Sequence, residues 1–319
     1  MKKQKKAKKS AKKIIILSLV VLIFSIAGML LYSRYIATTG LIVKEYKITN
    51  TKISNDYHGL KIIHISDIHY GRTVNQKEFN NMVNKINILK PDIVILTGDL
   101  LDRDVTLTSK QISDLVAGLK KINAKINKYA IMGNHDFAHD EWKNLIEKGG
   151  FINLNDTYDL IYGNSYEPIL ISGMSTNLLG DTNINDKLKL VNDFLDSISN
   201  NNINTNNNNN ESSPETNDNQ TSINVDPRYK ILVMHEPDFI DSFDYSKYDL
   251  ILAGHSHNGQ VRIPLIGALI LPEGAKKYYN EHYTLGKTEL YISSGMGTST
   301  IDFRFLNRPS INLYRLTNR

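Results

Sequence analysis

The sequence predicts an α/β fold in two layers, preceded by a single transmembrane helix. From residue 60 onward, short runs of β-branched residues alternate with longer stretches that have helical periodicity. Upstream lies an uncharged run of eighteen apolar or small residues, 14–31. With 41% hydrophobic residues in the whole chain, these patterns exclude collagen, a coiled coil, a fully disordered chain and a polytopic membrane protein.

The basic character of the chain belongs to its N-terminal tail. Residues 1–13 contain eight lysines, so the other 306 residues carry 30 basic against 33 acidic side chains, although the whole chain has a formal charge of +5. Affinity for nucleic acid depends on clustered Lys and Arg. We therefore expect no nucleic-acid-binding surface on the folded part.

The uncharged run, extended to residue 36, predicts a membrane anchor over residues 14–36. At about 1.5 Å per residue, eighteen helical residues span roughly 27 Å of a hydrocarbon core about 30 Å thick. Lysines flank only the N-terminal side, so the positive-inside rule keeps residues 1–13 in the cytoplasm and exports residues 37–319 from a single-pass cell-membrane protein. A cleaved signal peptide with a site at residues 25–27 is the alternative, although the apolar run continues past that site.

The elements of the exported part follow in order from local pattern. Residues 60–66 (LKIIHIS) and 93–97 (IVILT) are β-branched runs that predict strands, and residues 76–89 between them predict a helix. A helix near 109–122, a strand at 129–132 and a short helix starting at Asp140, a suitable N-cap, come next. Further strands are expected at 169–172, 229–234, 250–253, 290–293 and 311–314.

An Asn-rich tract interrupts this single domain. Residues 200–210 contain nine Asn, and Ser, Thr, Asp and Pro follow. Such a segment lacks the apolar residues that could offset its ordering entropy. We expect residues 200–226 to form a disordered surface insertion.

Polar side chains able to bind metal follow five of the predicted strands. Ligands of open α/β sheets bind beyond the carboxyl ends of the strands, so these five groups should converge. The chain has no cysteine, so any metal must be held by His, Asp, Glu or Asn, a donor set that suits Mn, Fe, Zn, Ni or Co. The groups are Asp67 and His69, Asp99 and Asp102, Asn134 with His135 and Asp136, His235, and His255 with His257.

Each motif alone is weak, but together and in this order they resemble the calcineurin-like metallophosphoesterase superfamily. The matching patterns are Asp-x-His, Gly-Asp-x-x-Asp, Gly-Asn-His-Asp, a lone His and Gly-His-x-His. Residues 254–260 and 293–297, with Arg304-Phe305 and Pro309, resemble the bacterial membrane-associated type, while Asn258 stands where many relatives have Gly. The resemblance covers about residues 61–316 and implies a two-layered β-sandwich core flanked by helices, in the order αββα.

The resemblance also implies two divalent transition-metal ions and a role for each site residue. One ion would be held by Asp67, His69, Asp99 and His257, and the other by Asp99, Asn134, His235 and His255. Two cations about 3.5 to 4 Å apart need a shared anion, which Asp99 supplies. With a bridging hydroxide the centre keeps a charge of about +1, which attracts a phosphate ester and supports attack by that metal-bound hydroxide.

Four further residues have expected roles in the chemistry. By resemblance, His135 protonates the leaving oxygen and Asp102 orients that imidazole. Arg103 and Arg72 are candidates to hold phosphate oxygens. The expected activity is membrane-anchored hydrolysis of a phosphodiester or pyrophosphate, possible substrates being lipid-linked because relatives of this type include such enzymes. The alternative is a catalytically silent extracytoplasmic scaffold that retains the fold.

Overall fold

Two six-stranded sheets form the centre of the protein. The computed structural model describes residues 2–164, 167–208 and 227–319. The first sheet has the order β1-β14-β2-β3-β4-β5 and the second β12-β13-β9-β8-β7-β6. The first contains β1 (Ile42–Thr49), β2 (Lys61–Ile65), β3 (Ile93–Leu96), β4 (Asn127–Ala130), β5 (Ile152–Asn153) and β14 (Ser310–Thr317). The second contains β6 (Thr157–Ile161), β7 (Ile169–Gly173), β8 (Tyr229–Val233), β9 (Leu250–Ala253), β12 (His282–Leu285) and β13 (Thr288–Ile292).

The strands that precede the polar motifs run in the same direction within each sheet. β2, β3 and β4 are parallel neighbours, and so are β8 and β9. Strand β14 runs antiparallel to β2 and carries β1 as its parallel outer neighbour. The carboxyl ends of β2, β3 and β4 therefore lie at one edge of the first sheet, which is the arrangement that brings their loops together.

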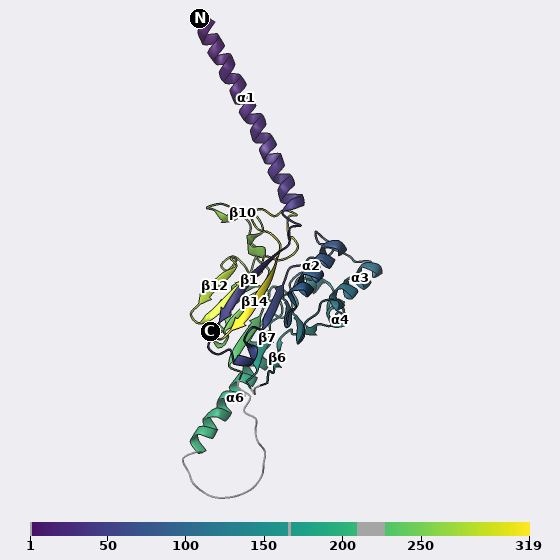
Figure 1. Cartoon of the computed structure of the whole chain (residues 1–319), viewed down its shortest axis with the longest axis vertical. Coiled ribbons are helices and arrows are strands. Elements are labelled where there is room, and N and C mark those ends of the chain that lie inside the picture. The colour runs from purple at the N-terminus through teal and green to yellow at the C-terminus, as the bar shows by residue number, and fades with distance from the viewer. Residues whose placement is uncertain (1, 165–166, 209–226) are drawn as a thin grey trace.

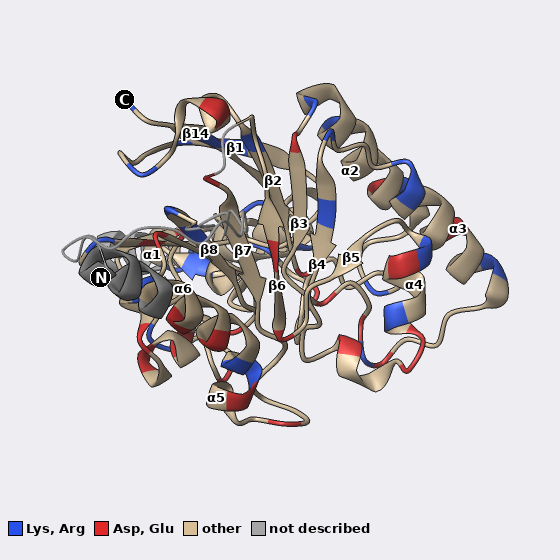
Figure 2. Ribbon diagram, turned by 90° about the horizontal axis from the view of Figure 1, so that it is seen from below, with Lys and Arg blue, Asp and Glu red and all other residues tan. Residues whose placement is uncertain are grey.

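Three apolar layers account for the packing. One core lies between the sheets and includes Ile62, Ile95, Ile231 and Leu252. A second core joins the first sheet to α2 (Gln76–Leu89), α3 (Ser109–Lys120) and α4 (Trp142–Lys148), and a third covers the second sheet on the side of α5 (Ile184–Lys187) and α6 (Lys189–Asn208). Figure 2 shows the two sets of helices on opposite sides of the strands. The predicted αββα sandwich is confirmed.

The helices of the first layer begin where side chains cap them. In α2, the Asn75 side chain accepts from the backbone of the first turn while Glu78 reaches back to the Asn75 backbone, and Thr108 and Gln111 do the same for α3. The expectation that Asp140 caps α4 is wrong, because the helix starts one residue later and its N-cap, Glu141, makes no side-chain capping bond.

The apolar N-terminal segment is one long helix. Helix α1 (Lys2–Leu31) continues into a π-helical turn, η1 (Tyr32–Ile36), and projects from the folded body in Figure 1. Its stretch Ser10–Ile36 has a mean hydropathy of 3.0 and is long and apolar enough to cross a membrane. A signal sequence has the same properties, so the helix fits both an anchor and a leader.

Helix α6, which runs into the Asn-rich tract, lies at the opposite end of the molecule from α1 (Figure 1). Helix α6 extends to Asn208, so the first residues of the predicted insertion continue a helix. Residues 209–226 lie outside the described residues, and the expected disorder of the insertion stays a prediction.

Candidate metal centre

The loops after five strands meet at one buried point, as the motifs predict. Asp67 and His69 follow β2, Asp99 follows β3, Asn134 follows β4, His235 follows β8, and His255 and His257 follow β9. All seven residues are buried. Their donor atoms include two clusters close enough to hold a metal ion, one of Asp67, His69 and His257 and one of Asp99, His235 and His255.

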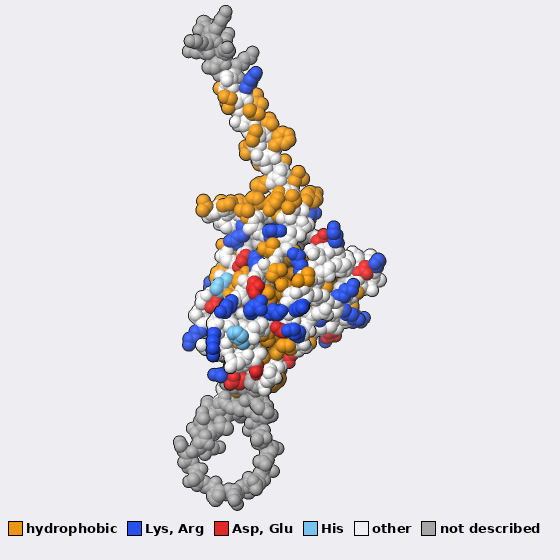
Figure 3. Space-filling view, in the orientation of Figure 1, with side chains coloured by type: hydrophobic (Ala, Val, Ile, Leu, Met, Phe, Trp, Pro, Cys, Tyr) orange, Lys and Arg blue, Asp and Glu red, His pale blue; other side chains and the backbone are white. Residues whose placement is uncertain are grey.

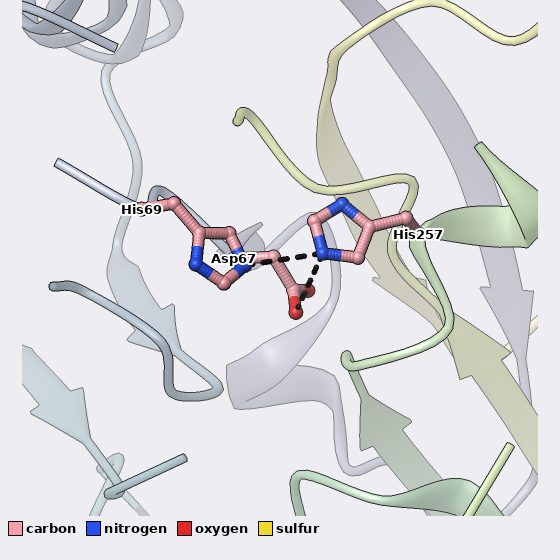
Figure 4. A group of neighbouring side chains, drawn as sticks. All are labelled: Asp67, His69 and His257. Carbon is pink, nitrogen blue, oxygen red and sulfur yellow. Dashed lines mark hydrogen bonds and ion pairs between the residues drawn. The ribbon is translucent and has the colours of Figure 1, made fainter. Parts of the chain in front are cut away.

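The first group consists of Asp67, His69 and His257. The two Nε2 atoms of the histidines are 3.1 Å apart, and His257 Nε2 is 3.6 Å from Asp67 Oδ1. Figure 4 shows both rings pointing toward each other beside the Asp67 carboxylate. Two imidazole nitrogens and a carboxylate oxygen directed at one point are a typical set of ligands for a divalent transition metal.

The second group consists of Asp99, Asn134, His235 and His255. His235 Nε2 is 3.3 Å from Asp99 Oδ2 and 3.1 Å from Asn134 Oδ1. Asp99 Oδ2 is also 3.6 Å from Nε2 of His69 in the first group. Asp99 is therefore placed to serve both groups.

Backbone carbonyls fix which nitrogen of two histidines can bind metal. The Nδ1 atom of His235 is 2.6 Å from the Thr97 carbonyl, and Nε2 of His255 is 2.7 Å from the Glu273 carbonyl. A carbonyl only accepts, so the ring nitrogen facing it carries the proton. Nε2 of His235 and Nδ1 of His255 are therefore the ring atoms available to a metal, and a hydrogen bond from the other ring nitrogen to a carbonyl is common for metal-binding histidines.

The backbone of the site is held in a conformation that non-glycine residues seldom adopt. Asp67, His69, Asp99, His255 and His257 all have φ between 47° and 65°. Each such residue costs on the order of 1 to 3 kcal/mol, and such strain concentrates at functional sites. The local sequence does not show this feature, because it results from the way the loops meet.

The electrostatics favour an ionised carboxylate at Asp99 and a neutral imidazole at His257. Burial alone would raise the pKa of Asp99, but the imidazoles of His235, His69 and His135 hold it well below its usual range. Burial, with the neighbouring His69, keeps the pKa of His257 well below 6.5. Burial also opposes a charge on His235, yet the carboxylate of Asp99 outweighs it and raises the pKa of His235. A cation bound beside Asp99 would take the place of that proton, so the donors present fit two divalent cations.

Asp102 contacts two histidines. Its Oδ2 atom lies 3.5 Å from Nδ1 of His135, the ring it is expected to orient, and 3.3 Å from Nδ1 of His69. Burial would raise the pKa of Asp102, but the two imidazoles lower it overall. These three residues are close enough to form a further candidate metal group. The sequence pointed only to the contact with His135.

The two candidate phosphate-binding arginines differ. Arg72 lines the cleft but is engaged, since its Nε lies 2.8 Å from Asp302 Oδ1 and its Nη1 lies 3.7 Å from Asp102 Oδ2. Arg103 is exposed at the cleft and makes no ion pair with any residue that the structure describes. Arg103 is therefore the better placed of the two to meet a phosphate oxygen.

Two buried charged residues had no assigned role. Asp136 accepts from the backbone N–H groups of Leu101 and Gly133, which ties two site loops together, and burial, with Asp99 nearby, raises its pKa to about 7. Arg304 is fully buried behind His257 and donates to the carbonyls of the 293–297 loop, while burial lowers its pKa to about 9. In the sequence, only the position of each residue within a motif indicated that it belongs to the site.

A cleft of about 530 Å³ opens over the two groups. Its floor includes Asp99, Asn134, His135, His255 and His257. Its rim combines Arg72 and Arg103 with apolar side chains, among them Leu269 and Ile270.

Comparison with known proteins agrees with this geometry. The model of the calcineurin-like phosphoesterase family matches residues 60–259. The uncharacterized metallophosphoesterase YkuE of Bacillus subtilis is 27% identical, with 89% of this chain and 88% of YkuE covered. Phosphodiesterase YaeI of Escherichia coli is 24% identical over 80% of this chain and 82% of its own. The UDP-2,3-diacylglucosamine pyrophosphatase LpxG of Chlamydia muridarum is 23% identical over 81% and 84%. The chain belongs to the calcineurin-like phosphoesterase family and is a metal-dependent phosphoesterase.

Proposed function

We propose that this protein is a membrane-anchored enzyme that hydrolyses phosphodiester or pyrophosphate bonds outside the cytoplasm. The observation that supports this most is the pair of buried donor groups that share Asp99 and face one cleft beside His135. Asp67, His69, Asp99 and His257 would hold one divalent cation, and the second would be held by Asp99, Asn134, His235 and His255. Mn, Fe, Zn, Ni and Co all suit these donors.

The chain's own groups then have separate tasks. When bound, the two cations supply Lewis-acid polarisation of the phosphoryl oxygens and activate the attacking water. His135 gives a proton to the leaving oxygen from the cleft floor, and the Asp102 carboxylate, 3.5 Å from Nδ1 of that ring, favours its protonated form. Arg103 holds a non-bridging phosphate oxygen. The sandwich keeps all donors fixed before substrate arrives, so little reorganisation is needed in the transition state.

An ester with a large organic group on each side of the phosphate fits the cleft better than a small monoester. Apolar residues such as Leu269 and Ile270 form part of its rim. Such side chains pack against an organic substituent, whereas they offer a free phosphate dianion neither a charge nor a hydrogen bond. A phosphodiesterase and a lipid-directed pyrophosphatase are among the similar proteins. Both likenesses support a diester or pyrophosphate, with lipid-linked substrates as the favoured class.

A panel of soluble esters tests the chemistry. The full-length protein in detergent, loaded with Mn²⁺, is assayed on matched p-nitrophenyl monoester and diester and on a nucleotide pyrophosphate. We expect kcat/KM for the diester or the pyrophosphate to exceed that for the monoester by at least roughly tenfold. A preference for the monoester would contradict the assigned substrate class, and no hydrolysis at all would favour a silent scaffold.

The topology is tested on intact cells. In the proposed arrangement residues 1–13 form a cytoplasmic tail, residues 14–36 the anchor and residues 37–319 the catalytic domain, because lysines flank only one end of the apolar run. Protease added outside should degrade the domain and leave the tail protected. Digestion of the domain only after lysis would show that the domain lies inside the cell. A mature N-terminus near residue 28 would mean that the apolar segment is cleaved.

A further inference from the structure

The most exposed apolar surface outside α1 is a hairpin beside the metal cleft. Strands β10 (Arg262–Ile263) and β11 (Gly267–Ala268) form it, and we call residues 263–272 the apolar hairpin. None of its ten residues carries a charge. Large side chains that a soluble surface would bury point outward here, namely Leu265 (108% exposed), Ile266 (69%), Leu269 (52%) and Ile270 (57%).

The tip of the apolar hairpin is also strained. Leu265 has a φ of 70°, a left-handed conformation that Leu adopts only at a cost. A turn that only had to connect two short strands would favour Gly, Asn or Asp at such a position. The sequence instead places its most exposed apolar side chain there, which points to a surface built for contact with an apolar phase.

Hydrogen bonds tie the apolar hairpin to the foot of the apolar N-terminal helix. The Arg304 N–H donates to the Ser33 carbonyl in η1 at 3.0 Å. The next residue, Phe305, exchanges backbone bonds with Gln260 and Arg262 at the base of the apolar hairpin. Arg34 of η1 adds an ion pair with Asp302 at 3.8 Å. The end of the helix and the apolar hairpin therefore form one connected structure.

Both features lie at the same end of the molecule. In Figure 1 the β10 hairpin stands at the foot of α1, and Figure 3 shows a continuous band of apolar side chains there, next to the apolar surface of the helix. Exposed Tyr32 and Tyr35, with Arg34 between them, mark the point where an anchored helix would leave the hydrocarbon. An apolar surface continuous with that point would meet lipid.

We propose that the apolar hairpin inserts into the lipid bilayer beside the anchor. The occupant of this surface is the outer leaflet, and Leu265 and Ile266 at the tip enter its acyl region. Leu269 and Ile270 of the same hairpin also line the metal cleft, together with His255 and His257. The cleft thus opens at headgroup depth, where the phosphate of an amphiphilic ester lies. This inference rests on the proposed anchored phosphoesterase and assigns its substrate to the membrane.

Depth labelling tests the insertion without use of activity. The chain has no cysteine, so Leu265→Cys can carry a single bimane label in full-length protein reconstituted in phosphatidylcholine–phosphatidylglycerol vesicles. The matched control is Ile88→Cys, an equally apolar residue that is 77% exposed at the end of α2, on the side where β3 begins, away from the cleft. We expect doxyl-labelled lipid to remove about half or more of the emission at residue 265 and little at residue 88.

Two results of the labelling would overturn the insertion. A label at residue 265 that iodide quenches as strongly as the one at residue 88 would place the tip in water. A label that neither iodide nor doxyl lipid quenches would place it against protein. Because neither readout requires turnover, both hold even if the enzyme hydrolyses no ester and the proposed function fails.

A second measurement tests the consequence for the substrate. The double variant Leu265→Ser/Ile266→Ser is assayed on hexadecyl p-nitrophenyl phosphate in vesicles and on soluble bis(p-nitrophenyl) phosphate, which share a leaving group. We expect roughly a tenfold or greater loss of kcat/KM on the vesicle ester, with the soluble ester unchanged and Ile88→Ser like wild type on both. Equal loss on both esters, or loss on neither, would overturn presentation of the substrate by the apolar hairpin.

Discussion

His135 is the histidine of the centre that neither donor group around Asp99 requires. The Arg103 backbone N–H donates to Nδ1 of His135 at 3.3 Å, and the Asp102 carboxylate lies 3.5 Å from the same atom. We expect His135→Gln to lower kcat by roughly 10² to 10⁴ on esters with alkoxide leaving groups, the usual contribution of a general acid. Nitrophenyl esters need no protonation of the leaving group, so they should lose far less.

Metal analysis of the same variant separates a proton donor from a ligand. His135 also lies within reach of a cation shared with His69 and Asp102, and in that case His135→Gln would lose metal. We expect its metal content to stay near wild type, whereas Asp99→Asn should lose metal and activity on every ester. Equal losses on activated and unactivated esters would mean that His135 is not the acid.

The double contact of Asp102 leads to a separate expectation. Its carboxylate faces Nδ1 of both His135 and His69. Asp102→Asn should therefore impair proton transfer and weaken metal binding about 10- to 100-fold, as does the loss of a carboxylate beside a metal-binding imidazole. Metal titration of the apoprotein measures this. Asp114→Asn, in an exposed ion pair on α3, is the control. Unchanged metal affinity would mean that Asp102 acts through His135 alone and does not support the metal ligand His69.

Burial of a neutral histidine makes stability depend on pH. His64 in β2 has partners at both ring nitrogens, Tyr314 at 3.2 Å and Thr97 at 2.8 Å, and burial lowers its pKa to about 3. In the unfolded chain its pKa is about 6.5. Below that value the unfolded state binds a proton that the folded state does not, so the free energy of unfolding falls as pH falls.

The effect of His64 should be measurable by denaturant titration. Between pH 7.5 and pH 5 it should remove about 2 kcal/mol from the free energy of unfolding. In His64→Gln this part of the decline should be absent, whatever the variant's stability at pH 7.5. Equal declines in both proteins would show that His64 is protonated in the fold.

At the scale of elements, local pattern identified those segments whose signals lie within a few residues. Helix α2 was predicted at its observed bounds, and β9 as well, because periodicity and end signals are local. Strand β1 was missed because it is an edge strand whose partner, β14, lies at the other end of the chain. Helix α6 was missed because its Asn-rich end has poor helix propensity, and its other end is held by packing on the second sheet.

The residues of the site also divide into those that a local sequence pattern predicts and those that depend on distant contacts. The order of the motifs placed the proposed ligands at strand ends, and the fold brings them together, since parallel strands end at a common edge. The contact between Asp102 and His69, the ties made by Asp136 and the buried Arg304 join loops that are distant in sequence. No local pattern encodes such contacts, so they required the structure.

The Asn-rich connection between α6 and β8 should be dispensable. It joins the second sheet at the start of β8, whereas His235 follows the opposite end of that strand. Replacing residues 200–226 by a short Gly-Ser linker should change stability by less than about 1 kcal/mol, because loop entropy varies slowly with length, and should leave turnover intact. Thermal unfolding and diester hydrolysis test this, and a domain that no longer folds would show that the segment is structural.

On the scale of the whole molecule, helix α6 and the apolar hairpin beside the metal cleft lie at opposite ends. The apolar hairpin, two of whose residues line the metal cleft, shares one end with the foot of α1, and helix α6 lies at the other end (Figure 1). In the proposed anchored arrangement, this one helix at the foot of the hairpin, α1, would set both the location and the orientation of the catalytic edge. The role proposed for this end of the molecule depends on a centre that binds metal and hydrolyses phosphate esters.

Metal stoichiometry measured together with hydrolysis tests that claim most directly. Full-length protein is stripped with a chelator and titrated with Mn²⁺, while bound metal and diester turnover are followed in the same samples. The account predicts no turnover in the stripped protein and recovery that is complete only near two ions per chain, because Asp99 lies between both donor groups. Full turnover by the metal-free protein, or maximal turnover at one ion per chain, would contradict it.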